Sequence, residues 1–153
     1  MAAEQHSGHY ALLSFGDLRI AFSQADVAQI GLAIDVDPAL RDGKDCGALV
    51  SKEARWPVYS LDAALAPALT LPERRRFCVC LRDHARGRAF ALSCESVTAL
   101  TIGQEMTVED LPECMQTPST PLRQVVTGDG ALTFLSSATS MADYLAMLEA
   151  RGE

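Results

Sequence analysis

Four cysteines and one histidine are the residues of this chain with the clearest potential for metal binding. Cys78 and Cys80 are two positions apart, and His84, Cys94 and Cys114 follow them. A structural zinc site usually takes closely spaced ligands on turns, often as a Cys-x-x-Cys pair, and no such pair is present. Cys78 and Cys80 lie instead inside an apolar run, where a strand would point both side chains to one face. We therefore predict buried, unligated thiols, no bound metal and no cofactor.

The sequence also lacks the usual catalytic patterns. It contains no Gly-x-Ser-x-Gly, no phosphate-binding loop and no His-Glu-x-x-His. Asp35, Asp37 and Asp42 lie in a charged segment without the ordered ligand spacing of a calcium loop. One alternative stays open: a small β-barrel enzyme or ligand-binding domain that uses the face carrying Cys78 and Cys80.

The composition indicates a folded, acidic chain. It has 153 residues, of which 48% are hydrophobic, and a net charge of −7. The hydrophobic content argues against disorder, and the excess of acid argues against a nucleic-acid binder, which needs basic patches to neutralise phosphates. No apolar run approaches the ~20 residues that span a bilayer, and residues 1–9 have no secretory-signal pattern. We expect a soluble, cytoplasmic protein with a flexible tail at 1–9 and no direct membrane insertion.

The elements that would carry any site are organised around two similar hairpins. Residues 76–100 contain two apolar runs on either side of a polar break with Gly87, which is typical of a β-hairpin. Residues 10–30 repeat this pattern around Gly16. Such a repeat suggests two similar small β units.

The segments that follow the two hairpins also align. Val27 corresponds to Val97, and Ile30 corresponds to Leu100. A shared helical face or a third strand would both fit the spacing of Val27 and Ile30.

Short strands and two short helices complete the predicted elements. We expect strands at 48–50 and 56–61, followed by a short helix at 61–66. A late hairpin at 122–135 and a C-terminal helix capped by Ser140 follow. Many short strands at regular spacing indicate mainly β structure in small barrels.

A family resemblance becomes specific at residues 47–61. Their sequence, GALVSKEARWPVYSL, resembles the CheW family stretch G-x-I-N-L-R-G-x-x-x-P-V-I-D-L without a gap. Residues 90–97, FALSCESV, are similar to the family's G-L-x-V-D-x-V, with Glu95 at the aspartate position. A late hairpin and a helix at 125–148 follow in the family's order.

The resemblance implies a single domain at 10–153, made of two packed, five-stranded SH3-like barrels. The subdomains would be about 10–66 and 76–136, with the C-terminal helix at 140–151. It implies a non-enzymatic adaptor that couples the cytoplasmic tip of a chemoreceptor to the regulatory domain of a CheA-type histidine kinase. Recruitment to membrane-associated receptor arrays would follow. A CheW-like scaffold in a pilus-motility pathway is the alternative within the family.

The resemblance also implies partner-binding residues. Receptor contact is expected in the groove between the barrels, with Val27, Ile30, Val97 and Leu100 as candidates. Burial in the barrel core is the alternative for each of these four.

The turn that reads N-L-R-G in the family differs here. Lys52 keeps the charge of the family arginine but not its flat, bidentate fork. Glu53 replaces a glycine, so a turn that needed positive φ must be rebuilt. We expect both side chains to be exposed, with Lys52 acting as a rim charge in partner docking.

Overall fold

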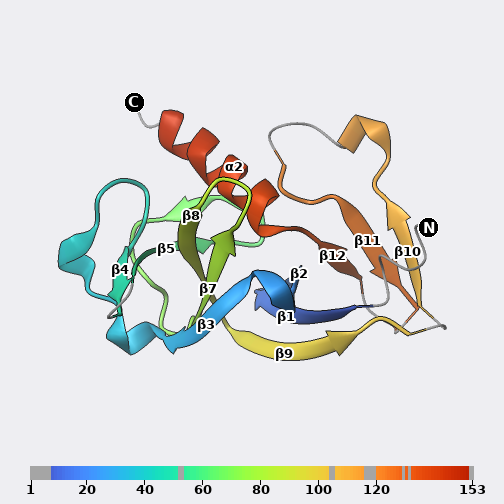
Figure 1. Cartoon of the computed structure of the whole chain (residues 1–153), viewed down its shortest axis with the longest axis horizontal. Helices are drawn as coiled ribbons and strands as arrows, with labels where there is room; N and C mark the ends of the chain where they lie inside the picture. Colours follow the sequence, from blue (N-terminus) through green and yellow to red (C-terminus); the bar gives the residue numbers. More distant parts are fainter. Residues whose placement is uncertain are drawn as a thin grey trace.

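The computed structural model shows a mainly β protein with two sheets and a C-terminal helix (Figure 1). The predicted fold class, mainly β with two packed β units, is confirmed. The residues that the structure describes are 8–51, 54–103, 106–115, 120–128, 130 and 132–151.

The first sheet has six strands in the order β10-β11-β12-β2-β1-β9. Its strands are β1 (His9–Phe15), β2 (Leu18–Ser23), β9 (Ser96–Thr101), β10 (Thr107–Asp110), β11 (Gln124–Thr127) and β12 (Thr133–Leu135). Strands β12 and β2 are parallel, whereas the other neighbours are antiparallel.

The second sheet has the order β3-β7-β8-β5-β4, with β6 (Pro67–Ala68) pairing with β5. Its strands are β3 (Val27–Leu32), β4 (Gly47–Val50), β5 (Arg55–Leu61), β7 (Phe77–Asp83) and β8 (Arg88–Cys94). Here β5 and β8 are the parallel pair. The predicted strands at 48–50 and 56–61 are therefore confirmed as β4 and β5.

The two sheets share one arrangement of four strands. In each sheet a hairpin forms the two central strands of this arrangement. The second strand of the hairpin pairs with a parallel strand, and the first strand of the hairpin pairs with the edge strand of the sheet. In the first sheet the hairpin β1–β2 lies between β12 and β9, and in the second the hairpin β7–β8 lies between β5 and β3. The sequence repeat thus corresponds to a repeated strand order.

The edge strands of the two units are exchanged. Strand β3 follows β2 in the chain, through the 3-10 turn η1 (Gln24–Asp26), but pairs with β7. Strand β9 follows β8 but pairs with β1. Each sheet takes strands from both predicted ranges, 10–66 and 76–136, because β12 pairs with β2 and β5 pairs with β8 in addition to this exchange. The subdomain boundaries expected from the sequence stay a prediction.

The hairpin turns lie where the glycines predicted them. Gly16, at φ +65°, belongs to the two-residue turn between β1 and β2, and only glycine adopts that angle readily. Gly87, at φ +68°, lies in the longer β7–β8 turn, and its N–H donates to the Asp83 carbonyl at 2.8 Å.

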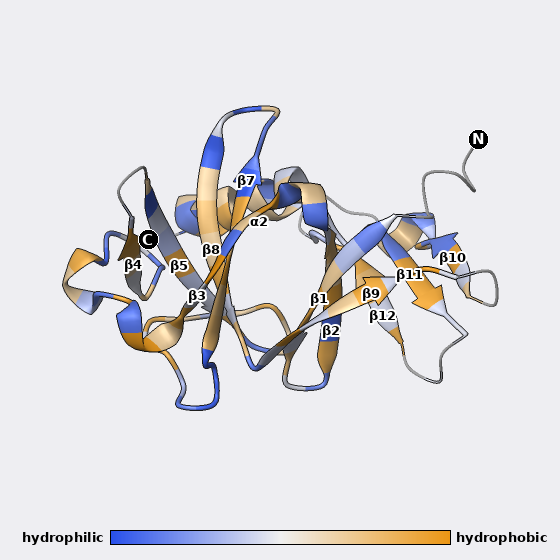
Figure 2. Cartoon of the chain, turned by 60° about the horizontal axis from the view of Figure 1, so that its bottom comes forward, coloured by the Kyte–Doolittle hydropathy of each residue, from blue (hydrophilic) through white to orange (hydrophobic). Residues whose placement is uncertain are grey.

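Apolar residues form three clusters. The largest lies between the two sheets and α2 (Ala138–Ala150), and it includes Leu13, Phe15, Ile20, Phe22, Val79, Leu81, Leu92, Met141 and Leu145. The second, on the opposite face of the second sheet, contains Val36, Leu49, Trp56, Val58, Cys78, Cys80 and Ala91. The third, on the opposite face of the first sheet, contains Leu12, Ala21, Leu100, Ile102, Val126 and Leu135. Each sheet therefore buries apolar residues on both of its faces. By contrast, Figure 2 shows that the turn between β7 and β8 is largely hydrophilic.

Helix α2 begins one turn earlier than predicted. Ser137, not Ser140, is its N-cap, because the Ser137 hydroxyl accepts from the Ser140 N–H at 3.0 Å. Asp26 adds a second cap across the molecule, accepting from the Ala138 N–H at 3.1 Å. Among the described residues, no helix is long and apolar enough to cross a membrane.

The short helix expected at 61–66 is absent, and that prediction is wrong. Strand β5 runs on to Leu61, and Asp62 then organises a turn. Its carboxylate accepts from the N–H groups of Ala64 and Ala66 at 2.8 and 3.0 Å. An aspartate that binds the backbone ahead of it favours such a turn over a helix interior.

Candidate docking surface

Val27 and Val97 occupy equivalent places beside the core that the two sheets share. Val27 lies opposite Leu81, and Val97 lies opposite Leu13. Both valines are partly buried and pack against the cluster between the sheets. The structure therefore brings these two predicted residues to the same core from opposite edges, as the sequence repeat suggested.

Ile30 and Leu100 do not match in this way. In β9 the pairing is regular, so Leu100 lies on the opposite face from Val97, and it is buried in the third cluster with 9% exposure. In β3 the register shifts between Val27 and Gln29, which is a β-bulge. Ile30 consequently lies opposite Val79, on the same face as Val27, and is 53% exposed.

The bulge places Ile30 in an exposed apolar row, of which the sequence analysis predicted Ile30 alone. Ile30, Leu32 and Ile34 are 53%, 49% and 87% exposed, and we call them the β3 row. Ile30 and Leu32 lie on edge strand β3, and Ile34 lies in the turn η2 (Ala33–Asp35) that follows. Their spacing of two was the available signal, because alternate residues of a strand share a face. Exposed apolar residues that cluster mark a contact surface better than single ones do.

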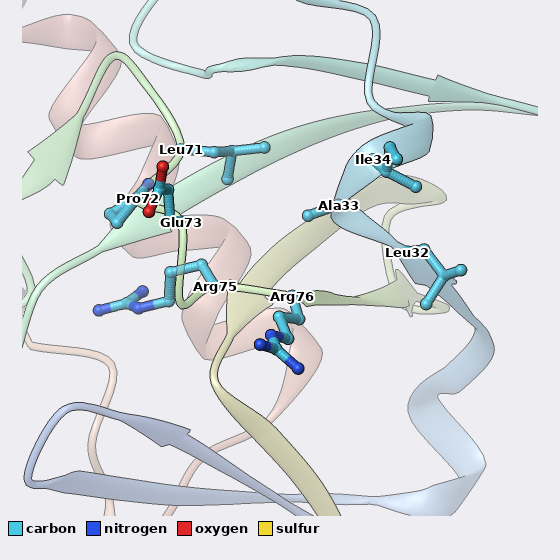
Figure 3. Close-up of a pocket in the computed structure, with 8 residues that line it drawn as sticks. All are labelled: Leu32, Ala33, Ile34, Leu71, Pro72, Glu73, Arg75 and Arg76. Carbon is cyan, nitrogen blue, oxygen red and sulfur yellow. The ribbon is translucent and has the colours of Figure 1, made fainter.

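A depression of about 430 Å³ lies beside this row (Figure 3). Leu32 and Ile34 form one side, and the segment before β7, from Leu71 to Arg76, forms the other. The Ala33 N–H donates to the Arg76 carbonyl at 2.9 Å, which holds the two sides together. The depression is mainly apolar with basic groups on one side.

Arg75 is the buried member of that basic side. Its guanidinium lies 5.5 Å from the centre of the Phe15 ring and donates to the Ser93 carbonyl at 3.3 Å. Its Nε is 3.6 Å from the Glu95 carboxylate. Arg75 therefore joins the two sheets, since Phe15 belongs to β1 and Ser93 to β8. Arg76, which is exposed, is the arginine that a partner could reach from solvent.

Lys52 and Glu53 lie outside the described residues, so their placement stays a prediction. On either side of them, the Ser51 N–H donates to the Ala54 carbonyl at 2.9 Å. Val50, immediately before the turn, is 66% exposed.

The thiols of Cys78 and Cys80 are buried, as predicted, in the second cluster. Burial raises the pKa of Cys78 to about 12 and that of Cys80 to about 11, so both stay protonated near neutral pH. A buried, protonated thiol is a poor nucleophile, which counts against an enzyme that uses this face. Within the part of the chain that is described, no three His, Cys, Asp or Glu side chains are placed to hold a metal ion.

No protein-family model and no curated protein sequence matches this chain. A solved structure does: the scaffolding protein TtCheW from Thermoanaerobacter tengcongensis, at a TM-score of 0.63 and 12% sequence identity. The alignment covers 85% of this chain and 88% of that one. At this identity the likeness establishes the fold and no more. The chain therefore has a CheW-like fold of two packed β subdomains.

Proposed function

We propose that this protein is a non-enzymatic adaptor that couples a chemoreceptor to a CheA-type histidine kinase in bacterial chemosensory signalling. The observation that carries the proposal is the likeness to a CheW scaffolding protein over 85% of the chain. The family pattern at residues 47–61, found independently in the sequence, supports it. The protein would act in the cytoplasm, at arrays of membrane-bound receptors.

The β3 row gives the receptor a contact surface. It is an apolar strip on an exposed sheet edge, beside Val27 and close to the core that both sheets share. A helical receptor tip could lay an apolar face along such a strip. Leu100 is buried in this structure, so we place receptor contact on Ile30, Leu32 and the exposed parts of Val27 and Val97.

The adaptor would act by holding the receptor and the kinase in a fixed position relative to each other. If one protein binds receptor and kinase at separate sites, a change of receptor state alters kinase activity through a coupling free energy between those sites. The turn with Lys52 and Glu53 would supply the contact with the kinase regulatory domain. Such a role needs no catalytic group, and the protonated Cys78 and Cys80 thiols agree with it.

The proposal is tested with purified partners from the native cell. We expect the protein to bind both a CheA regulatory domain and a receptor tip fragment, measured by calorimetry. The double variant Ile30→Asp with Leu32→Asp should weaken receptor binding about tenfold or more, because it places charges in an apolar contact. Leu132→Asp is the matched control, since Leu132 is 54% exposed and lies next to β12, in the other sheet. If the wild-type protein bound neither partner, the proposed function would be wrong.

A second variant addresses the kinase contact. Lys52→Glu should slow association with the kinase regulatory domain and leave thermal stability nearly unchanged, because a rim charge acts mainly on the association rate. Unchanged association at low salt, where screening is weakest, would remove Lys52 from the interface.

A further inference from the structure

An acidic pocket lies between the segment before β4, strand β5 and the C-terminal end of α2. Its volume is about 340 Å³. The residues that line it are Asp42, Asp45, Arg55, Pro57, Tyr59 and Glu149. Three carboxylates thus face one guanidinium, and no residue is shared with the depression beside the β3 row.

Glu149 ties the walls of this pocket together. Its Oε2 accepts from the Lys44 N–H at 2.9 Å and from the Tyr59 hydroxyl at 2.9 Å. It also lies directly over Gly43, where an added Cβ would come within 2.6 Å of Glu149 Oε1. The loop, β5 and α2 therefore hold one another in place, and the pocket is preformed.

Asp45 gives the observation that points to a ligand. Its side chain is almost completely buried, with 2% exposure. One oxygen, Oδ1, accepts from the Asp42 N–H at 3.1 Å, whereas Oδ2 is buried with no hydrogen-bond partner. Buried polar atoms nearly always have a partner, so this oxygen calls for a donor that the described part of the chain does not supply.

The carboxylates act together on the Tyr59 hydroxyl. Burial raises the pKa of Tyr59, and the hydrogen bond to Glu149 and the charges of Glu149, Asp45 and Asp42 raise it further. The phenol therefore stays protonated and remains a donor to Glu149.

The shape of the pocket selects among cations. Among the described residues, no three acidic, histidine or cysteine side chains are arranged to hold a metal ion. The pocket instead shares Pro57, Tyr59 and Glu149 with a groove of about 210 Å³. This groove is mainly apolar, with Phe90 and Leu145 in its lining, and Arg88 is its basic residue. A ligand that fits both has a charged head with several N–H donors for the acidic pocket and a short carbon chain for the apolar groove.

We propose that this pocket binds an organic cation, an alkylammonium or alkylguanidinium, with its charged head on Asp45 and Glu149 and its carbon chain in the groove between β5 and α2. This goes beyond the adaptor function and does not depend on it. No receptor or kinase is needed to test it.

The test uses the full chain and small probes. n-Butylguanidinium and n-butylammonium are titrated at constant ionic strength, and the amide signals of Gly43 and Lys44 are followed by NMR. We expect saturable shifts with Kd of about 1 mM or tighter. Tetramethylammonium, which has no N–H donor, and CaCl₂ should bind at least about tenfold more weakly.

Two variants tie the binding to the acids. Asp45→Asn keeps an oxygen to accept from Asp42 but removes the charge, and it should weaken binding about tenfold or more. Glu149→Gln, which keeps an acceptor for Lys44 and Tyr59, should also weaken it and serves if Asp45→Asn does not fold. Asp35→Asn, at an exposed site in η2, is the control.

Three results would overturn the proposal. One is the absence of saturable binding up to about 10 mM of either butyl probe. Another is binding of calcium or tetramethylammonium as tight as that of the butyl probes. The third is unchanged binding in a folded Asp45→Asn or Glu149→Gln variant.

Discussion

Strands β3 and β9 hold equivalent positions in the sequence repeat and in the strand order, yet they present different surfaces. Each follows a hairpin, crosses to the other sheet and pairs with the first strand of the other hairpin. Val27 and Val97 match, but Ile30 is 53% exposed whereas Leu100 is 9% exposed. The difference arises from the one-residue register shift in β3.

This comparison shows how a duplicated unit can acquire a surface that its twin lacks. Regular pairing sends alternate residues to opposite faces, so Leu100 is available to fill the third cluster. The bulge keeps Ile30 on the face of Val27, and Leu32 follows on the same face. One extra residue in an edge strand therefore exposes an apolar row without changing the fold.

The hairpin ends offer a second comparison. Phe15 and Asp83 both end the first strand of their hairpin, and both are completely buried. Phe15 packs in the shared core, whereas Asp83 accepts from Arg88 Nε at 2.7 Å and from the Thr139 hydroxyl at 2.6 Å. Arg88 also donates to Asp143 at 2.8 Å, so this network anchors α2 to the β7–β8 hairpin.

The largest expected effect comes from breaking that network. Asp83→Ala should lower the free energy of unfolding by about 3 kcal/mol, because it removes the hydrogen bonds that Asp83 accepts from Arg88 and Thr139 and leaves the partly buried Arg88 with Asp143. Asp17→Ala is the matched control, since Asp17 is exposed in the turn of the other hairpin. Urea denaturation of both variants measures the difference. Equal stability of the two would mean that the hairpins do not differ in how they are anchored.

The same aspartate gives a pH dependence with a defined sign. Hydrogen bonds from Thr139 and Arg88, and the charge of Arg88, lower the pKa of Asp83. Below the unfolded pKa of about 3.9, the unfolded chain binds a proton that folded Asp83 resists. The stabilisation is therefore full above that pH and is lost as the pH falls through the lowered pKa. Subtracting the unfolding free energies of Asp83→Asn from those of wild type, pH by pH, should show this decline.

Leu100 should be the next most sensitive position. Leu100→Ala removes a buried side chain from the third cluster and should cost about 2.5 kcal/mol in the free energy of unfolding. Chemical denaturation with an unchanged m-value measures this loss. A cost below about 0.5 kcal/mol would show that Leu100 is not part of the core.

The sequence predicted the units but not how they combine. The hairpins followed from apolar runs around Gly16 and Gly87, which the structure confirms. The exchange of β3 and β9 could not be predicted, because a strand after a hairpin can pair with either hairpin and bury the same valine.

The candidate surface was predicted only in part, for a similar reason. Its bulge lies at Ala28, which is not a glycine and does not have positive φ; among the described non-glycine residues, Leu65 is the one with positive φ. No local signal therefore marks the shift. The alternation of Ile30, Leu32 and Ile34 was visible in the sequence, but it is equally typical of a strand with a buried face.

The smallest expected effect on stability is at Ile30, and it tests the comparison of the two strands most directly. Ile30→Ala should change the free energy of unfolding by less than about 0.5 kcal/mol, because a half-exposed side chain on an edge strand loses little burial. The measurement is the same urea titration, with Leu100→Ala as the matched variant at the equivalent position. Equal losses at both positions would mean that β3 pairs regularly in solution and buries Ile30 as β9 buries Leu100. Unequal losses, with Leu100 the more costly, would leave the register shift as the cause of the exposed row.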